Sequence, residues 1–580
     1  MLIYCYAIYF IMKNIRQNKK GAAKMKVLVI GGVAGGATAA ARLRRLDEKA
    51  EIIMFEKGPY VSFAACGLPY FLGGRIVDDV NKLIVRTPEQ FVRKNNIDAR
   101  VNNRVTSIDT ENKKVEAEDL VTGKKYTESY DKLIISTGSF PFRPNIPGID
   151  SEGVFTLWNI PDAVKIKEFI SDKKVKNVVI VGGGAIGLEV AENLAESGQK
   201  ITIVELSDHL IAPLDSDMAV LVNKYVTEKG IEVILNDGVT AIEKNGDGLT
   251  VRLRESGVGT DMVLMSVGAK PQSELAKEAG LDINERGFIK VDDRMMTSDP
   301  DIYAVGDVTE VKNFITGKPA SVALAGPANK QGRIAADNIA GIKSRYGGIQ
   351  GTGILKIFDM TVAFTGLSEK EAQRNGLDFD NVLVYHHPHA GYYPGGEEMA
   401  MKVVFEVPTG RILGAQIVGR TGVDKRCDVL AASIRMGATA YDLTELELAY
   451  SPPFGTPKDA VNMVGFVIEN VLSGKLEKVE WNSIEGMPAE EEAIFIDVRG
   501  DDAISVSEVR IDGFRRIPLE ELRGKLSQLD RNKPVYVHCR NGKEGYYAAC
   551  LMKQEGFDVS NLDGGCLFRD CSICSCETKP

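Results

Sequence analysis

The chain has 580 residues, a length that allows about four domains. Its composition, with 44% hydrophobic and 26% charged residues, is ordinary for a soluble globular protein. The formal net charge of −9 argues against nucleic acid as a bulk partner. Nine cysteines spread over a long chain fit a reducing cytosol better than a secreted disulfide scaffold, so we expect a cytoplasmic protein.

The first 24 residues differ in character from the rest of the chain. The stretch from Leu2 to Met12 is apolar, but it is too short to span a bilayer, and the basic residues come after it rather than before it. We expect residues 1–24 to be an extension outside the fold or the product of an upstream start, without stable membrane insertion. The alternative is an anchor that lies on a membrane surface.

A nucleotide-binding unit begins at Met25. The run Met25–Ile30 predicts a buried parallel strand, and it leads through Gly31-Gly32-Val33-Ala34-Gly35-Gly36 into an alanine-rich helix, Ala37–Leu46. Glycines let a pyrophosphate approach the backbone, and the helix N-terminus offers free N–H groups. Glu56 closes the next strand, Ile52–Phe55, where an acid would bind ribose hydroxyls. Because Val33 replaces a motif glycine, this unit needs support from elsewhere in the chain.

A second unit supplies that support. The strand Val178–Val181 leads into Gly182-Gly183-Gly184-Ala185-Ile186-Gly187, which has glycine at all three required places. A helix, Leu188–Ser197, and a strand, Ile201–Val204, come next. Glu205 then should hydrogen-bond an unphosphorylated ribose and repel a 2′-phosphate, which favours NADH over NADPH. Two such units in one chain are a far more specific signal than one glycine motif.

Cys66 lies between the two units, in Ser62-Phe63-Ala64-Ala65-Cys66-Gly67, and no second cysteine is near it. A flavoprotein that stores electrons in its own disulfide needs two closely spaced cysteines. A lone cysteine beside a flavin can instead form a mixed disulfide, a persulfide or a sulfenic acid, each of which needs an outside sulfur or oxygen species. The alternative is a buried, inert cysteine. The two flanking units favour the reactive interpretation.

Ser136-Thr137-Gly138 and Ile302-Tyr303-Ala304-Val305-Gly306-Asp307 complete a known pattern. The first 470 or so residues resemble the pyridine nucleotide–disulfide oxidoreductases, and within them the single-cysteine branch that holds coenzyme A-disulfide reductase, NADH oxidase and NADH peroxidase. The resemblance implies FAD and NADH as cofactors. The implied FAD contacts are Gly31, Gly32, Ala34, Gly35, Gly36, Glu56, Lys57, Thr137, Gly138, Asp307 and Ala325. The implied NADH contacts are Gly182, Gly184, Ile186, Gly187, Glu205 and Gly268.

Within this branch the sequence favours the coenzyme A-disulfide reductases. Peroxidase relatives carry a histidine where this chain has Ala34, whereas Arg42 and Arg45 lie at i and i+3 on one helix face, suited to the phosphates of a nucleotide thiol. The alternative for the arginines is a solvated surface. Ala65 replaces an asparagine of some members. The resemblance implies coenzyme A contacts at Thr38, Arg42, Arg45, Ser62, Phe63, Lys94, Asn329, Tyr392 and Lys458.

The same resemblance implies a homodimer in which each chain completes its partner's site. Tyr392 or Tyr450, from the partner chain, would position or protonate the leaving thiolate at Cys66.

The C-terminal segment predicts a small α/β unit. Strands at Ala493–Val498 and Pro534–His538 precede a loop and the helix Tyr546–Gln554, and the loop reads Cys539, Arg540, Asn541, Gly542, Lys543, Glu544, Gly545. A cysteine between a strand end and a helix N-terminus meets converging N–H groups, which stabilise a thiolate or persulfide. Because a phosphatase cysteine would suit the same geometry, the loop alone is ambiguous.

Asp497-Val498-Arg499 and this loop together resemble rhodanese, a sulfurtransferase. Glu544 occupies a place where many rhodaneses carry arginine, which weakens any inference that thiosulfate is the sulfur donor.

We therefore predict an α/β chain with two Rossmann-like dinucleotide-binding domains, an α+β dimerisation domain and a C-terminal rhodanese-like α/β domain. The expected boundaries are 1–24 for the extension, 25–144 and 270–345 for a split FAD domain, 145–269 for the NADH domain, 346–472 for the dimerisation domain, 473–489 for a linker, 490–570 for the rhodanese domain and 571–580 for a cysteine-rich tail.

With a rhodanese domain attached, the resemblance narrows to fusions that act as NADH-dependent persulfide and polysulfide reductases. The implied reaction passes electrons from NADH through FAD to sulfur at Cys66, while Cys539 accepts or presents sulfane sulfur and coenzyme A carries it. Persulfides, polysulfides and coenzyme A disulfide are the implied substrates, and the sequence does not rank them.

Two rival functions remain open: an NADH oxidase that cycles Cys66 through a sulfenic acid, and a flavin redox sensor or sulfur-carrier protein. Near the C-terminus, Cys566, Cys571, Cys574 and Cys576 could bind zinc, but they lack a second paired half-site. We predict no metal site, and instead an exposed flexible tail or an accessory sulfur relay.

Overall fold

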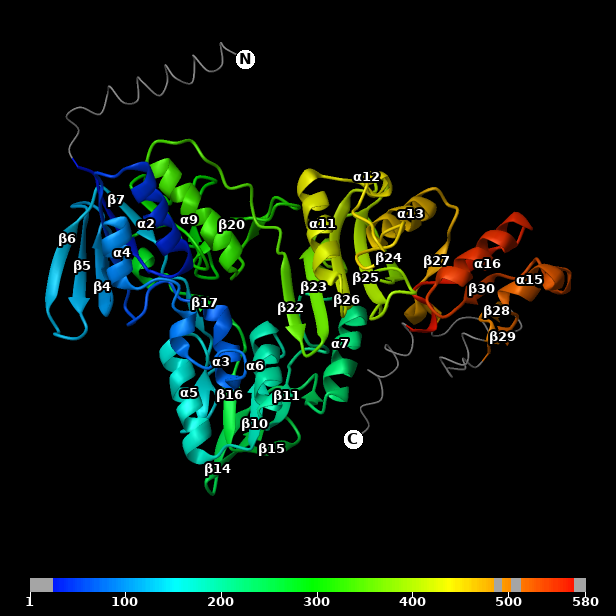
Figure 1. Cartoon of the computed structure of the whole chain (residues 1–580), viewed down its shortest axis with the longest axis horizontal. Coiled ribbons are helices and arrows are strands. Elements are labelled where there is room, and N and C mark those ends of the chain that lie inside the picture. Colours follow the sequence, from blue (N-terminus) through cyan, green and yellow to red (C-terminus); the bar gives the residue numbers. More distant parts are fainter. Residues whose placement is uncertain (1–23, 485–492, 502–512, 568–580) are drawn as a thin grey trace, which may run out of the picture.

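The computed structural model describes residues 24–484, 493–501 and 513–567 (Figure 1). The expected N-terminal extension before Lys24 and the thiols of Cys571, Cys574 and Cys576 lie outside these residues. Among the helices described, none is long and apolar enough to cross a membrane. The described chain forms four successive domains, each built on a five-stranded sheet.

The first domain is built on a parallel sheet with strand order β19-β7-β1-β2-β3. Helices α2 and α9 cover one face, and a three-stranded antiparallel sheet and α8 cover the other. Because β19 and α9 come from a later part of the chain, this domain is split in sequence. Its main elements are β1 (Lys26–Ile30), α2 (Ala34–Leu46), β2 (Glu51–Phe55), η1 (Ala65–Gly67), α3 (Leu68–Gly73), η2 (Val80–Leu83), α4 (Pro88–Asn95), β3 (Asp98–Arg100), β4 (Asn103–Asp109), β5 (Lys114–Asp119), β6 (Lys125–Ser129), β7 (Lys132–Ile135), β8 (Ser139–Pro141), β17 (Ala269–Pro271), α8 (Glu274–Glu278), β18 (Ile289–Lys290), β19 (Ile302–Ala304), β20 (Thr309–Lys312), β21 (Pro319–Ala320) and α9 (Ala325–Ile339).

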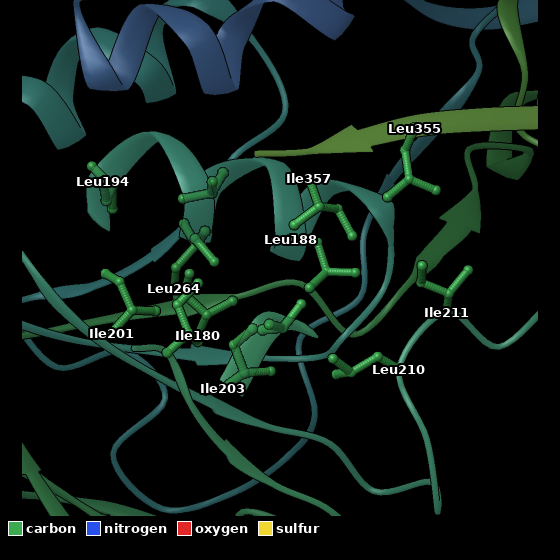
Figure 2. Close-up of a cluster of buried hydrophobic side chains, with 14 of the residues drawn as sticks. Ile180, Leu188, Leu194, Ile201, Ile203, Leu210, Ile211, Leu264, Leu355 and Ile357 are labelled. Atoms are coloured by element: carbon green, nitrogen blue, oxygen red, sulfur yellow. The ribbon is translucent and has the colours of Figure 1, made fainter. Parts of the chain in front are cut away.

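The second domain repeats this plan with strand order β12-β11-β10-β16-β9. Alternate side chains of β10 point to opposite faces, so Ile180 packs under the helices α5, α6 and α7 and Val179 packs against a three-stranded antiparallel sheet. Figure 2 shows the helix-side cluster, in which Leu188 lies beside Leu355 and Ile357 of the next domain. The elements are β9 (Val154–Thr156), α5 (Ile160–Lys173), β10 (Asn177–Val181), α6 (Ala185–Glu196), β11 (Lys200–Val204), α7 (Ser216–Glu228), β12 (Glu232–Ile234), β13 (Ala241–Asn245), β14 (Gly248–Arg252), β15 (Gly257–Thr260) and β16 (Met262–Met265).

The third domain is an antiparallel sheet of order β22-β23-β26-β25-β24, with α11, α12 and α13 on one face. Its other face meets the second domain, where the buried Lys402 lies 2.5 Å from Asp217 and 2.6 Å from Glu369. Three carboxylates, including Asp215, surround this ammonium group and raise its pKa, although burial alone would lower it. The elements are β22 (Gly353–Ile357), β23 (Met360–Gly366), α10 (Glu369–Asn375), β24 (Phe379–His386), β25 (Met399–Glu406), β26 (Ile412–Gly419), α11 (Val423–Met436), α12 (Ala440–Glu445) and α13 (Ala460–Leu472).

The fourth domain is a parallel sheet of order β27-β31-β30-β28-β29. Its elements are β27 (Lys478–Val479), η3 (Trp481–Ile484), β28 (Ile494–Asp497), β29 (Arg515–Arg516), α15 (Leu519–Lys525), η4 (Leu526–Gln528), β30 (Val535–His538), α16 (Lys543–Gln554) and β31 (Val559–Leu562).

Strand β27 corrects part of the predicted linker, 473–489. Lys478 and Val479 pair with β31, and the Trp481 indole N–H donates to the Gly565 carbonyl at 2.9 Å. The buried Lys478 ammonium also lies 2.9 Å from Asp380 of the third domain. A two-residue strand leaves no periodic pattern in a sequence, which explains the error. Residues 478–484 therefore belong to the fourth domain.

Three helices begin earlier than the sequence predicted. Helix α2 starts at Ala34, α6 at Ala185 and α16 at Lys543, in each case three residues before the expected first residue. In all three the first helical turn is made by residues of the preceding glycine-containing loop. The free N–H groups of each helix therefore belong to the loop itself, where an anion would bind.

Candidate active site

The first glycine loop accepts only glycine at its critical positions. Gly31 has φ +100°, and a Cβ there would lie 2.1 Å from the Ser136 carbonyl oxygen. A Cβ on Gly36 would lie 1.9 Å from the carbonyl oxygen of Gly31. These contacts hold strand, turn and helix close together and leave the loop backbone bare. The loop thus fits the pyrophosphate of a dinucleotide.

Glu56 fixes the same loop from the end of β2. Its carboxylate accepts hydrogen bonds from the backbone N–H of Gly32 at 3.0 Å and of Gly58 at 2.8 Å. Burial raises the pKa of Glu56, and these two N–H donors oppose that shift.

The other residues predicted to contact FAD come from several segments of the chain. Thr137 donates to the Gln272 carbonyl at 2.6 Å, and Lys57 donates to the Gln272 side chain at 3.0 Å. Asp307 follows β19, accepts from the Ser139 hydroxyl at 3.1 Å, and has a pKa raised by burial. Gly138 and Ala325, the latter the first residue of α9, complete this region. The donor set matches what a flavin's ribityl and phosphate groups need, and these residues would hold FAD.

The second glycine loop repeats the first. Gly182 has φ +106°, and its Cβ would lie 2.3 Å from the Ser266 carbonyl oxygen, while a Cβ on Gly187 would lie 2.2 Å from the Gly182 oxygen. Glu205 accepts from the N–H of Gly183 at 2.7 Å and of Ser207 at 2.8 Å. Gly184 and Gly268 face open space, and Ile186 is exposed on the first turn of α6. These residues would hold NADH.

Cys66 is exposed, within the 3-10 helix η1 that precedes α3. The segment before it is held in place by its backbone: Ser62 N–H donates to the Gly32 carbonyl at 2.8 Å, and Val85 N–H donates to the Ser62 carbonyl at 2.8 Å. Ser62 adopts φ +49°, and Phe63 forms a β-bridge with Ile84. The segment that leads to Cys66 is therefore fixed to the first glycine loop, and the thiol is open to an incoming sulfur compound.

Sequence reasoning missed Tyr70, which lies near Cys66, and Glu189, which lies near Tyr70. Tyr70 lies one helical turn after Cys66, and Glu189 lies two residues after Gly187 on α6. Both line an open cavity of about 510 Å³, which Lys356 and Arg420 of the third domain also line. Burial, followed by the nearby Glu192 carboxylate, raises the pKa of Glu189 to about 7. An acidic residue two positions after a glycine motif was the available signal.

The predicted coenzyme A contacts are partly brought together. Thr38 on α2 donates to the Asn329 side chain on α9 at 2.6 Å. Arg42, one turn further, is already paired with Asp337 at 2.7 Å, whereas Arg45 is exposed. Lys94 and Lys458 are exposed on separate domains.

Tyr392 and Tyr450 do not meet Cys66 within one chain. Their exposed fractions are 78% and 50%, and no contact found in the described part of the chain joins either ring to the cysteine. They lie on neighbouring loops of the third domain, linked by a 3.3 Å hydrogen bond from Ala390 N–H to the Pro452 carbonyl.

Cys539 does not have the stabilised thiolate that the sequence predicted. The thiol is fully buried, and burial raises its pKa to about 11, helped by the charge of Glu544. The backbone N–H groups of Gly545, Asn541 and Glu544 do converge on the sulfur and lower its pKa, as expected, but they do not outweigh burial. The loop therefore favours the neutral thiol of Cys539, because burial removes the sulfur from contact with water. A phosphatase cysteine requires the opposite shift.

The loop around Cys539 is shaped by close backbone contacts. Gly542 has φ +88° and caps α16, and a Cβ on Gly545 would lie 2.1 Å from the Asn561 side-chain oxygen. Lys543 is exposed at the loop surface. Within the described ranges, no group of three or more His, Cys, Asp or Glu residues could hold a metal ion.

Three models of known families match the chain, and the first of them spans both dinucleotide-binding domains. Residues 25–332 match the pyridine nucleotide-disulphide oxidoreductase model, 353–460 match the dimerisation domain of that family, and 481–567 match a rhodanese-like domain.

Individual relatives are also similar. Coenzyme A disulfide reductase of Staphylococcus haemolyticus is 36% identical over 442 residues, covering 76% of this chain and 98% of that protein. The reduced CoADR-RHD protein of Bacillus anthracis has a TM-score of 0.92 at 43% identity, covering 95% and 99% of the two chains. An NAD-dependent persulfide reductase from A. fulgidus has a TM-score of 0.88 at 37% identity, covering 94% and 100%.

Proposed function

The chain belongs to the pyridine nucleotide–disulphide oxidoreductases, and from that premise we propose that it uses NADH to reduce persulfides, polysulfides and coenzyme A disulfide at Cys66. Membership confirms the family resemblance and the fold class predicted from the sequence, with FAD and NAD(H) as the cofactors of the family. The dimerisation domain supports a homodimer. The named relatives support both sulfur substrates, since one is a coenzyme A disulfide reductase and another a persulfide reductase.

One observation carries this proposal: Cys66 is exposed beside the first glycine loop, and the sequence holds no other cysteine between Cys5 and Cys427. The closely spaced cysteine pair that an internal redox disulfide needs is therefore absent at this site. The sulfur that receives electrons must come from outside. An exposed thiol held by backbone bonds to a dinucleotide loop is placed to accept it.

The reaction at Cys66 balances as thiol–disulfide exchange. The Cys66 thiolate attacks one sulfur of a substrate RSSR′, a Cys66–S–S–R bond forms, and R′S⁻ leaves and takes a proton. Two electrons and a proton then release RSH and restore the Cys66 thiolate, so that NADH, one proton and RSSR′ give NAD⁺, RSH and R′SH. Bound FAD would carry these electrons from NADH to the sulfur.

Residues of the chain prepare both ends of this reaction. Glu56 and Glu205 fix the two dinucleotide loops through their N–H groups. Tyr392 or Tyr450 of the partner subunit would stabilise the leaving thiolate, which explains why both rings are solvent-exposed in a single chain. Cys539 would present sulfane sulfur from a separate, buried loop.

The test is steady-state turnover of NADH with coenzyme A disulfide, coenzyme A persulfide and polysulfide, for the unmodified protein and Cys66→Ser. We expect the variant to keep its flavin and to bind NADH but to lose turnover by at least a hundredfold, because no sulfur remains to form the mixed disulfide. Cys427→Ser, at a buried cysteine of the third domain, is the matched control and should retain turnover. Turnover of Cys66→Ser within a few-fold of the unmodified protein would contradict the proposal.

The rival functions give different outcomes. An NADH oxidase would consume oxygen in step with NADH when no sulfur substrate is present. A redox sensor would bleach its flavin once with NADH and recover only stoichiometrically on addition of polysulfide.

A further inference from the structure

The two residues that follow Cys539 are held by a carboxylate from another domain. Glu398, the residue before β25, accepts from Arg540 Nη1 at 2.6 Å through one oxygen and from Asn541 Nδ2 at 3.1 Å through the other. The side chains of Glu398 and Arg540 are 14% and 33% exposed. Both carboxylate oxygens of Glu398 are thus used at a half-buried contact between the third and fourth domains.

This contact sets the charge around the sulfur loop. Arg540 and Lys543 supply two positive charges, and Glu544 and Glu398 supply two negative charges. Glu544 already disfavours negative charge at Cys539, since it contributes to the raised pKa of the thiol. Of the two cationic residues of this loop, Arg540 is neutralised by Glu398, which leaves the exposed Lys543 to attract an anion. A doubly charged donor therefore meets a loop with no net positive charge.

Arg540 nevertheless has one hydrogen-bond donor that a ligand could use. Its Nε atom is buried and has no hydrogen-bond partner among the described residues. A guanidinium group binds oxyanions through paired N–H groups, so Arg540 released from Glu398 could offer Nε and Nη2, which lie on one edge of the group, together.

We propose that Glu398 determines which sulfur donors Cys539 accepts, by holding Arg540 and so disfavouring dianionic oxyanion donors, of which thiosulfate is the simplest, relative to singly charged persulfides. The inference rests on the proposed role of Cys539 as the sulfur acceptor and adds the identity of the residue that sets its donor class. Glu398 is a positioning residue, because it acts through Arg540 and Asn541.

The reaction concerned is a transfer of neutral sulfur without net redox change. The Cys539 thiol loses its proton to solvent, and the thiolate attacks the outer sulfur of thiosulfate. A Cys539–S–S⁻ persulfide forms, the S–S bond of thiosulfate breaks, and sulfite leaves with the electron pair. Cyanide then attacks the terminal sulfur, giving thiocyanate and the Cys539 thiolate.

The main experiment compares Glu398→Gln with the unmodified full-length protein in sulfur transfer to cyanide, using thiosulfate and the singly charged cysteine persulfide as donors. Glutamine keeps the size of the side chain and removes its charge. We expect the KM for thiosulfate to fall about five- to tenfold with little change in kcat, because Arg540 becomes available to the dianion. The KM for the persulfide should change less than twofold. The gain for thiosulfate should shrink as salt rises from about 0.05 to 0.5 M, since added ions screen the attraction.

The role of Arg540 is tested in the Glu398→Gln background. There Arg540→Gln should remove the whole gain for thiosulfate, because the gain depends on the released guanidinium group. Arg540→Gln alone leaves the Glu398 carboxylate without its partner, so it should raise the KM for thiosulfate. A gain that survives in the double variant would overturn the inference.

Glu397→Gln is the matched control, since Glu397 is the preceding acid and pairs with Arg420 at 2.8 Å rather than with the sulfur loop. It should leave the thiosulfate KM unchanged. If Glu398→Gln shifts both donors by the same factor, the contact only docks the domains and the inference is wrong; an unchanged thiosulfate KM also overturns it. Cys539→Ser distinguishes a failure of the proposed role of Cys539 from a failure of the inference about Glu398. Sulfur transfer that survives Cys539→Ser refutes the role of Cys539 itself. Loss of sulfur transfer in Cys539→Ser, together with an unchanged thiosulfate KM in Glu398→Gln, refutes only the inference about Glu398.

Discussion

The carboxylate of Glu205 accepts a hydrogen bond from the backbone N–H of Gly183 at 2.7 Å, so the residue expected to select the coenzyme also holds the loop that binds its pyrophosphate. Glu56 makes the same bond to Gly32 at 3.0 Å in the first domain. The duplicated unit thus repeats a hydrogen bond as well as a sequence motif. Because backbone N–H groups hold its carboxylate, the Glu205 side chain cannot rotate away from a 2′-phosphate.

Glu205→Ala is therefore expected to shift the ratio of kcat/KM for NADH over NADPH roughly tenfold towards NADPH, because the repulsion is removed. The KM for NADH should rise as well, since Gly183 and Ser207 lose their acceptor. Steady-state kinetics with both coenzymes measures this. Asp208→Ala, which removes a nearby exposed acid paired with His209, serves as the control. An unchanged ratio in Glu205→Ala would show that another residue selects the coenzyme.

The two reactive cysteines should differ sharply in alkylation. Cys66 is exposed, whereas Cys539 is buried and its pKa is raised to about 11. At pH 7 we expect iodoacetamide to modify Cys66 first. The rate at Cys539 should rise about tenfold per pH unit up to pH 10, because only the thiolate reacts. Mass spectrometry of timed samples distinguishes the sites, and the buried Cys427, with a pKa raised to about 12, gives a baseline. Equal rates at Cys66 and Cys539 at pH 7 would contradict the structure.

The sequence predicted the two dinucleotide units well, because their strands, glycines and acids follow local rules. Gly31 and Gly36 must be glycine for reasons that involve only the adjoining strand and helix. The thiol of Cys539 is a different case. The N–H donors around its sulfur are local and were predicted. Its burial depends on the packing of the whole fourth domain, so the predicted direction of its pKa shift was wrong.

Contacts between distant segments that lie outside the recognised motifs could not be predicted. Glu398 and Arg540 are 142 residues apart, and neither belongs to a motif that names the other. The same holds for Glu189, whose environment is completed by Lys356 and Arg420 of another domain. The roles given to Tyr392 and Tyr450 stay predictions, because they depend on a partner chain.

Glu189 should give the protein a distinct pH dependence. Burial raises its pKa to about 7, above the value of an unfolded glutamate, about 4.3, so the folded state binds the extra proton between these values. The free energy of unfolding contributed by this group therefore falls as pH rises from about 4.5 to 7.

The substitution Glu189→Gln should remove this pH-dependent decrease in the free energy of unfolding. The difference in Tm between the variant and the unmodified holoprotein should become more favourable to the variant as pH rises from 5 to 8. Thermal melts at fixed ionic strength measure it. Glu196→Gln, on the same helix, should not reproduce the trend. A Tm difference that is constant with pH would show that Glu189 does not titrate in this range.

The final prediction concerns the division of labour between the two cysteines, which lie in separate domains. Cys539→Ser should leave NADH-linked reduction of coenzyme A disulfide within about twofold of the unmodified protein, because that reaction needs only Cys66 and the cofactors. It should abolish sulfur transfer to cyanide, because the loop loses its nucleophile. Both reactions are assayed on one preparation, with Cys550→Ser on the neighbouring helix as control.

Polymeric sulfur distinguishes independent sites from coupled ones. If Cys539 supplies Cys66, the Cys539→Ser variant should also turn over polysulfide several-fold more slowly while keeping its activity on coenzyme A disulfide. The Glu398 contact fixes the fourth domain against the third within one chain, so such coupling would require a diffusible or tethered carrier rather than direct contact of the two sulfurs. Added coenzyme A should then raise polysulfide turnover in the unmodified protein and not in Cys539→Ser. Loss of all three activities together would mean that the cysteines form one composite site, and loss of none would refute the sulfurtransferase role of Cys539.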